Sequence, residues 1–235
     1  MSTLRISDLS KKFRMNDFYS LDSVNLEVNA GDIVGLVGRN GAGKSTLLKL
    51  IAKSYIPTSG SIEYNENNIF ENDYILKDVG VMIEPVFYPY MTVKENLDFY
   101  LELHGKPQFK KNIDSVLELV DLAGKKNKKP ETFSFGMKQR LSLAIVLVDE
   151  PDFLILDEPF VGLDPNGVQE LLEILKRWVQ KRNIAMIISS HQLSELESIC
   201  NRFVMLENGK MEHIRLEDER SLSHYFAEQK GWADK

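Results

Sequence analysis

The stretch that decides the fold is Gly38-Arg39-Asn40-Gly41-Ala42-Gly43-Lys44-Ser45-Thr46, which has the pattern G-x-x-x-x-G-K-S. The run before it, Ile33–Val37, is short, apolar and rich in β-branched residues, as is typical of a buried parallel strand. The run after it, Thr46–Ala52, carries leucine and isoleucine at helical spacing. A strand, a glycine-rich turn and a helix in this order are typical of a loop that binds phosphate groups.

The residue types of this loop, Gly38–Thr46, suit phosphate chemistry. Glycines let the backbone curl closely around an anion, so that N–H groups of the loop and of the helix N-terminus point at it. Lys44 is expected to reach the β- and γ-phosphates of a nucleotide, and the hydroxyl of Ser45 to bind Mg²⁺. A tight strand-to-helix turn with a chance lysine is the alternative, and the presence of both flanking elements argues against it.

Length and composition predict an ordinary globular protein. The chain has 235 residues, 43% of them hydrophobic and 27% charged, which suits one large domain or two closely packed lobes. The net charge of −6 gives no support to nucleic-acid binding. The single cysteine, Cys200, excludes an internal disulfide framework and is expected to pack in the core. No apolar run approaches the roughly 18 residues that a membrane span needs, and no secretory signal is present, so we expect a soluble chain or one held at a membrane by a partner.

An aromatic residue precedes the phosphate loop. Two strands are predicted near Leu4–Leu9 and Leu21–Val28, and Phe13 lies in the loop between them. The ring could stack on an adenine, because every base has a π-face. The alternative is an aromatic that packs on the small sheet, and the spacing leaves both open.

The composition and the predicted secondary structure change after a predicted strand at Val79–Ile83. An aromatic, proline-punctuated loop, Glu84–Tyr90, leads into a largely helical region from Thr92 to about Val148. Thr92-Val93-Lys94-Glu95 predicts a capping box at its first helix. This region is interpreted as a helical lobe inserted into an α/β core.

Two further apolar strands end in polar residues. Phe153–Leu156 is followed by Asp157 and Glu158, and Ile184–Ser189 by Ser190-His191. Ligands of open α/β sheets bind at the carboxyl ends of the strands. Asp157 is suited to Mg²⁺, Glu158 to the activation of water, and His191 to contact with a γ-phosphate. Asn208-Gly209, between two more apolar runs, predicts a hairpin.

Taken together, these residues resemble the nucleotide-binding subunit of an ATP-binding cassette (ABC) transporter over nearly the whole chain. The segment Phe133–Arg140 matches the signature motif of that family, and Gly162-Leu163-Asp164-Pro165 matches its D-loop. His191 matches the switch histidine. Phe13 matches the adenine-stacking aromatic, which favours that interpretation over simple packing.

The resemblance implies an α/β fold of the P-loop NTPase class. An ABC-type ATPase core with a small antiparallel β subdomain would comprise residues 1–84 and 149–215, an inserted helical subdomain residues 85–148, and a C-terminal tail residues 216–235.

The resemblance also implies ATP and Mg²⁺ as cofactors and a head-to-tail pair of cassettes, either identical or sister subunits. Each ATP would lie between the phosphate loop of one cassette and the signature motif of the other, where Ser134, Gly136 and the D-loop residue Asp164 would contribute. Closure and hydrolysis would drive an integral membrane permease, with the cassettes on the cytoplasmic face of the membrane. Nucleic acid is not an expected partner.

Three positions depart from the family pattern. Phe135 stands where the signature usually has glycine, and Met137 where it usually has glutamine. Glu84 replaces the usual Q-loop glutamine and, with Ser45 and Asp157, is a predicted Mg²⁺ ligand, since hard cations prefer carboxylate oxygens.

These departures resemble the branch that handles bacteriocins, lantibiotics and bacitracin-type peptides for self-protection (immunity), together with related drug exporters. Export of another substrate, such as a lipid, a polysaccharide or an ion, stays open. A soluble cassette that acts on ribosomes or nucleic acid is a further alternative. Such proteins usually carry two fused cassettes or a long coiled-coil insertion, and this sequence shows neither feature. Glu158 and His191 argue against a switch that binds ATP without hydrolysis.

Overall fold

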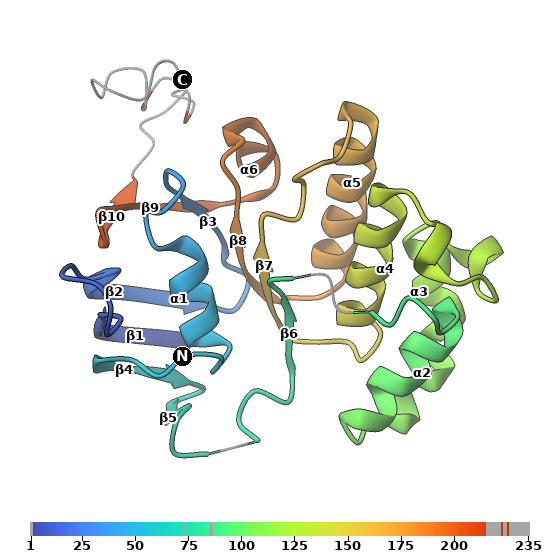
Figure 1. Ribbon diagram of the computed structural model, residues 1–235, viewed down its shortest axis with the longest axis horizontal. Coiled ribbons are helices and arrows are strands. Elements are labelled where there is room, and N and C mark those ends of the chain that lie inside the picture. Colours follow the sequence, from blue (N-terminus) through green and yellow to red (C-terminus); the bar gives the residue numbers. More distant parts are fainter. Residues whose placement is uncertain (1, 73, 85–86, 215–221, 223–224, 226–235) are drawn as a thin grey trace.

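The computed structural model describes residues 2–72, 74–84, 87–214, 222 and 225. Two sheets form the α/β part of the molecule, and a group of helices covers one side of the larger sheet (Figure 1). The tail predicted at residues 216–235 lies outside the described residues, apart from Leu222 and Tyr225.

The smaller sheet is antiparallel and has the strand order β2-β1-β4-β5. Its strands are β1 (Ser2–Lys11), β2 (Leu21–Asn29), β4 (Ser59–Tyr64) and β5 (Asn67–Asn68). The first two were predicted from the sequence. The two-residue strand β5 was not, because it lies in a polar stretch without the alternation that marks a strand.

The larger sheet has the order β10-β9-β3-β8-β7-β6 and is parallel except for its last strand, β10. Its strands are β3 (Ile33–Val37), β6 (Val79–Met82), β7 (Phe153–Asp157), β8 (Ala185–Ser189), β9 (Arg202–Glu207) and β10 (Lys210–Ile214). The carboxyl ends of β3, β6, β7 and β8 therefore lie along one edge, where the predicted site residues follow them. The hairpin at Asn208-Gly209 is confirmed, with positive φ at both residues (48° and 76°).

Helices occupy both faces of the larger sheet. The helix α1 (Lys44–Ile51) lies between the two sheets, and α5 (Pro165–Lys181) and α6 (Leu193–Ile199) follow β7 and β8. The region predicted to be helical contains α2 (Val93–Leu103), η1 (Pro107–Asn112), α3 (Ile113–Leu119), η2 (Ala123–Lys125), η3 (Pro130–Thr132) and α4 (Phe135–Leu147). The predicted capping box at Thr92 and Glu95 is present.

Alternating residues of the buried strands point into two separate hydrophobic cores. On β3, Val34 and Leu36 belong to the core shared with α1 and the small sheet, whereas Ile33 and Val37 belong to the core shared with the helices. This explains the continuous apolar runs in the sequence, because a strand covered on both faces buries every side chain. Each fully buried leucine or valine contributes about 1.5–3 kcal/mol to folding.

Cys200 directly follows α6 and is partly buried against the helical core. Burial raises the pKa of its thiol, which keeps it protonated and chemically inert. Within the residues that the structure describes, none of the helices has the length and apolar character that a membrane crossing requires.

Candidate nucleotide-binding site

The predicted phosphate loop connects β3 to the first turn of α1. Gly43 takes a left-handed conformation with φ of 109°, and the helix begins at Lys44 with no side chain capping it. A Cβ at Gly43 would come within 2.5 Å of the carbonyl oxygen of Ser20, so only glycine fits there. The uncapped helix start leaves N–H groups suited to an anion.

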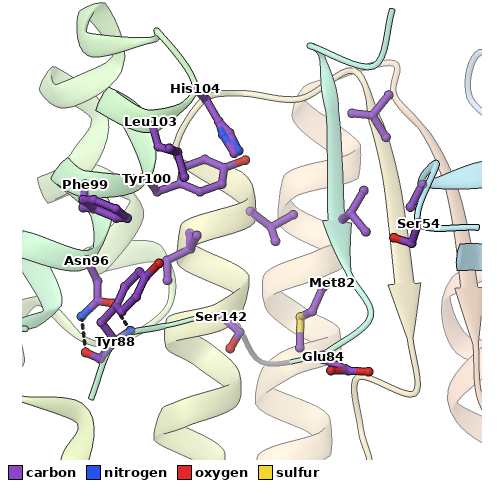
Figure 2. Close-up of a pocket in the computed structure, with 15 residues that line it drawn as sticks. Ser54, Met82, Glu84, Tyr88, Asn96, Phe99, Tyr100, Leu103, His104 and Ser142 are labelled. Carbon is purple, nitrogen blue, oxygen red and sulfur yellow. Dashed lines mark hydrogen bonds between the residues drawn. The ribbon is translucent and has the colours of Figure 1, made fainter. Parts of the chain in front are cut away.

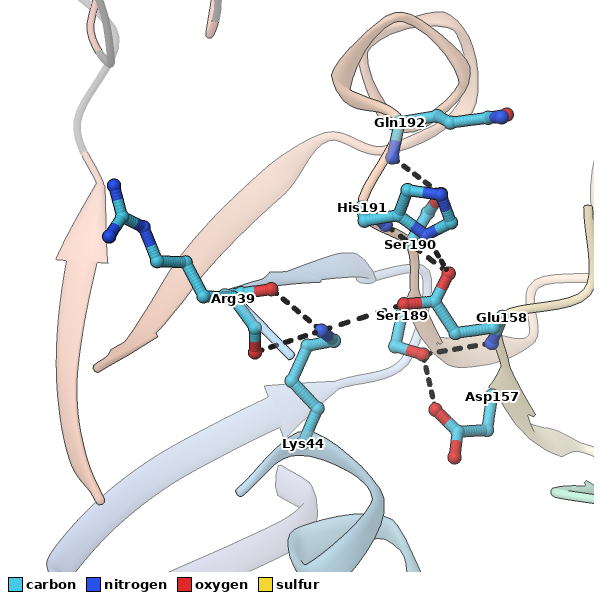
Figure 3. Close-up of polar contacts among 9 residues, drawn as sticks. Arg39, Lys44, Asp157, Glu158, Ser189, Ser190, His191 and Gln192 are labelled. Atoms are coloured by element: carbon cyan, nitrogen blue, oxygen red, sulfur yellow. Dashed lines mark hydrogen bonds and ion pairs between the residues drawn. The ribbon is translucent and has the colours of Figure 1, made fainter. Parts of the chain in front are cut away.

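Lys44 is almost completely buried, at 6% exposure, and its side chain folds back over the loop. Its ammonium donates a hydrogen bond to the carbonyl oxygen of Gly38 at 2.6 Å, with a longer contact to Arg39 at 3.5 Å. It also lies 3.5 Å from Glu158 Oε1 (Figure 3). The lysine therefore joins the loop after β3 to the carboxylate after β7.

Ser189, at the end of β8, links the two acidic residues after β7. Its hydroxyl donates a hydrogen bond to Asp157 Oδ1 at 2.5 Å and accepts one from the backbone N–H of Glu158 at 2.9 Å. Ser189 is fully buried, so this arrangement is fixed by the core (Figure 3). Ser189 was not predicted to have a role; its position immediately before Ser190-His191, at the end of an apolar strand, was the available signal.

Glu158 has a left-handed backbone, with φ of 47°, which is uncommon for a residue other than glycine. Its Oε2 accepts a hydrogen bond from the backbone N–H of His191 at 3.2 Å and lies 2.8 Å from the Nδ1 atom of that ring. The carboxylate is thus held between Lys44 and His191 at the edge of the sheet (Figure 3).

The residues predicted to bind Mg²⁺ come from three elements at this edge. Asp157 ends β7, Ser45 is exposed in the first turn of α1, and Glu84 follows β6. In the parts of the chain described here, no group of three or more His, Cys, Asp or Glu side chains is arranged as a metal cage. The chemistry fits Mg²⁺ nonetheless, because this ion is commonly held by one or two carboxylates together with substrate phosphates and water.

Phe13, the predicted adenine-stacking aromatic, lies in the loop between β1 and β2. Its ring meets Tyr55 edge-on, with ring centroids 5.4 Å apart, and the Lys11 ammonium lies 5.1 Å from its centroid. The end of the same loop, at Ser20, packs against Gly43 of the phosphate loop. Stacking of Phe13 on adenine stays a prediction.

The signature motif and the D-loop line a depression of about 550 Å³, and no residue of the phosphate loop lines it. Ser134 and Asp164 both line it, and both are N-caps: Ser134 Oγ accepts from Met137 N–H at 3.3 Å, and Asp164 Oδ1 from Gly167 N–H at 3.0 Å. Gly136 lies in the first turn of α4, on the wall of the same depression. These residues therefore form a group separate from Lys44 and Glu158.

The fold and the site define a P-loop nucleotide-binding protein. The family model described as ABC transporter matches residues 21–161, more than half of the chain, and the chain belongs to this family. It is accordingly an ATP-binding ATPase, and the family and fold predicted from the sequence are confirmed.

Among known proteins, two bacitracin transport ATP-binding proteins are similar to this chain. The one from Bacillus licheniformis is 39% identical, over 97% of this chain and 77% of the relative. The one from Enterococcus faecalis is 38% identical, over 88% of this chain and 68% of the relative. A solved structure of an ATP-binding subunit of an ABC transporter is 30% identical, with a TM-score of 0.86, covering 97% of this chain and 99% of that one.

Proposed function

We propose that this chain is the ATPase subunit of an exporter that removes peptide antibiotics of the bacitracin or lantibiotic type. The observation that carries the choice of substrate is the similarity, over nearly the whole chain, to a relative whose name states bacitracin transport. Glu84 in place of the usual Q-loop glutamine supports the same branch.

The roles of the site residues follow from their geometry. The phosphate loop holds the β- and γ-phosphates, with Lys44 exchanging its contacts to Gly38 and Glu158 for phosphate oxygens. Glu158 orients and deprotonates the attacking water, and His191 contacts the γ-phosphate while the carboxylate of Glu158 fixes its ring.

Ser45 and Asp157, with Glu84, are the residues that would hold Mg²⁺. When bound, Mg²⁺ neutralises charge between the β- and γ-phosphates. Asp157 is ready for this role, because the hydrogen bond from Ser189 to Oδ1 fixes the direction of its carboxylate.

The separation of the signature depression from the phosphate loop supports a pair of cassettes. Ser134, Gly136 and Asp164 line a hollow that none of the phosphate-loop residues of the same chain reach. In a head-to-tail pair, the signature motif of each cassette completes the ATP site of the other. Gly136, at the start of α4, then offers a backbone N–H to the γ-phosphate.

A groove between the larger sheet and the helices is the proposed socket for a cytoplasmic helix of the permease (Figure 2). It has a volume of about 370 Å³ and is lined mainly by apolar and aromatic side chains from β6, α2 and α4, with Tyr88 and Glu84 at its rim. Val86, in the same loop as Tyr88, lies outside the described residues.

The domain division is part of the same proposal. The core and β subdomain comprise residues 1–84 and 149–215, and the helical subdomain residues 85–148. The course of the chain supports it, because α2, α3 and α4 gather beside the β6 edge, away from the small sheet (Figure 1).

The test is antibiotic tolerance. A strain lacking the gene should become sensitive to bacitracin or to a lantibiotic, and expression of the wild-type chain with its permease should restore tolerance. The Glu158→Gln variant should not restore it. Unchanged tolerance to every peptide tested, combined with loss of tolerance to another compound or of a lipid or polysaccharide export phenotype, would assign a different substrate to the same ATPase.

A further inference from the structure

Glu84 and Asp157 follow neighbouring strands of the larger sheet. In the parallel pairing of β6 with β7, Met82 is opposite Leu156, so Asp157 and Glu84 extend from the same edge one and two residues further on. The Glu84 side chain is 75% exposed, and its Oε1 lies 3.0 Å from the ammonium of Lys49. The carboxylate is therefore directed by the Lys49 ammonium on α1.

Lys49 is held from two sides. In addition to its contact with Glu84, the ammonium of Lys49 lies 5.9 Å from the ring centroid of Tyr55. The ammonium of Lys11 lies over the same ring. The ammonium of Lys49 therefore faces the Glu84 carboxylate at hydrogen-bond distance.

Three carboxylates stand at an edge that must accept a triphosphate. Glu158 is paired with Lys44, Asp157 accepts a hydrogen bond from Ser189, and Glu84 is paired with Lys49. An uncompensated Glu84 would repel the phosphates, because like charges closer together than a Debye length still interact through solvent. A glutamine at this position would need no such partner.

We propose that Lys49 is a positioning residue that compensates the charge of Glu84 and fixes the direction of its carboxylate beside the metal position. This inference rests on the proposed nucleotide site, and it assigns to α1 a role beyond that of Lys44 and Ser45. Since exposed ion pairs are weak, the contact can be exchanged when Glu84 turns toward Mg²⁺.

The test compares ATP affinity with and without metal for four proteins: wild type, Lys49→Met, Glu84→Gln and the double variant. Methionine keeps the apolar length of the lysine stem and removes only its charged end. Equilibrium titrations with ATP in EDTA and with ATP and Mg²⁺ measure binding rather than turnover. Lys110→Met is the matched control, because Lys110 is paired with Glu102 at 2.6 Å on the helical lobe.

We expect Lys49→Met to weaken ATP binding in EDTA by about fivefold, the scale of one solvent-screened charge close to the phosphates. The loss should be smaller with Mg²⁺, because the metal then compensates Glu84. The double variant should bind ATP in EDTA within about twofold of Glu84→Gln alone, since the charge that Lys49 compensates is gone. Lys110→Met should match wild type.

Two results would overturn the inference: unchanged ATP affinity of Lys49→Met in EDTA, or a loss that persists in the double variant. The second result would mean that Lys49 contacts the nucleotide or supports the fold, and thermal unfolding of each variant separates those two. Failure of the wild type itself to bind ATP, or binding by Lys44→Ala equal to wild type, would instead reject the nucleotide site.

Discussion

Glu158 Oε2 lies 2.8 Å from His191 Nδ1, and these two residues follow different strands of the sheet. The backbone N–H of His191 donates to the same oxygen at 3.2 Å. The residue predicted to activate water thus also fixes the ring predicted to contact the γ-phosphate. A change at Glu158 therefore affects both.

Glu158→Gln should abolish turnover while ATP binding is retained. Glutamine preserves the shape of the side chain but cannot deprotonate water, and loss of a general base typically costs a factor of about 100 or more. Phosphate release measures turnover, and size-exclusion chromatography with ATP and Mg²⁺ should show a trapped dimer. Glu118→Gln, at an exposed position of α3, is the control. Normal turnover of Glu158→Gln would reject the role given to this carboxylate.

His191→Ala should lower turnover as well, with ATP affinity changed much less. The variant leaves Glu158 paired with Lys44 at 3.5 Å and keeps the backbone N–H of residue 191 that donates to Oε2, so only the ring contact is lost. Single-turnover phosphate release at saturating ATP is the measurement. A rate equal to wild type would show that the contact between Glu158 and His191 has no part in the chemistry.

Lys44→Ala should abolish measurable ATP binding, because it removes the charge that faces the β- and γ-phosphates. The lysine is buried and donates to Gly38 at 2.6 Å, so unfolding must be checked by circular dichroism. Lys110→Ala, on the helical lobe, controls for the loss of a lysine elsewhere. Unchanged nucleotide affinity of a folded Lys44→Ala protein in a fluorescence titration would show that the phosphate loop is wrongly assigned.

The parts of the site that the sequence predicted are those encoded locally. The phosphate loop and the apolar strand before Asp157 each combine neighbouring residues with a clear period or spacing, as does the capping box at Thr92 in the helical region. Ser189 and Lys49 were not predicted as site residues. Their contacts to Asp157 and Glu84 join residues more than 30 positions apart. These contacts depend on the strand register and on how α1 packs against the larger sheet. No local pattern carries that information.

Phe135 covers Gly162, and this contact joins the signature motif to the D-loop. A Cβ at Gly162 would lie 2.8 Å from the ring, and Gly162 has φ of 77°. Gly162→Ala should therefore destabilise the protein by about 1–3 kcal/mol, from backbone strain and from the ring together.

The contribution of the ring to that loss is isolated by a double-mutant cycle with Phe135→Ala, read by urea denaturation. Removal of the ring relieves the clash but leaves the backbone strain. We expect a coupling energy of at least about 0.5 kcal/mol between the two changes. Additive effects would mean that the ring moves aside without cost.

Asp149, which follows α4, and Lys106, which follows α2, form a buried ion pair at 2.6 Å. Burial raises the pKa of Asp149, and Lys106 opposes the rise. Because the pKa in the folded state lies above that in the unfolded state, the folded state binds more protons. This stabilising contribution is present at low pH and is lost as the pH rises through the folded pKa.

Lys106→Met removes the opposing charge, so the pH dependence should become steeper. At pH 8 we expect a loss of about 3 kcal/mol, the scale of a broken buried pair, and a clearly smaller loss at pH 5. Urea denaturation at both pH values measures it. Asp149→Asn in the same chain should remove the pH dependence of the loss; an equal loss at both pH values in Lys106→Met would mean that Asp149 does not titrate there.

Tyr88 is the residue through which coupling to the permease is best tested. Its backbone is fixed by Asn96: the N–H of Tyr88 donates to Asn96 Oδ1 at 2.6 Å, and Asn96 Nδ2 donates to the Tyr88 carbonyl at 3.0 Å (Figure 2). The ring is 48% exposed at the rim of the groove and meets Phe99 edge-on, with centroids 5.1 Å apart. Tyr88→Ala keeps both backbone contacts, so the loop should hold its place.

We therefore expect Tyr88→Ala to leave the ATPase rate of the isolated subunit within about threefold of wild type, or roughly 0.7 kcal/mol of transition-state energy. Assembly with the permease and antibiotic tolerance in cells should both fall, because aromatic side chains dominate interface hot spots. Tyr90→Ala is the matched control, since Tyr90 is 75% exposed but does not line the groove. The decisive pair of assays is ATPase activity of the isolated subunit and pull-down with the permease. If Tyr88→Ala lowers both in proportion to lost folding stability, the loop supports only the helical lobe and the groove is not the socket.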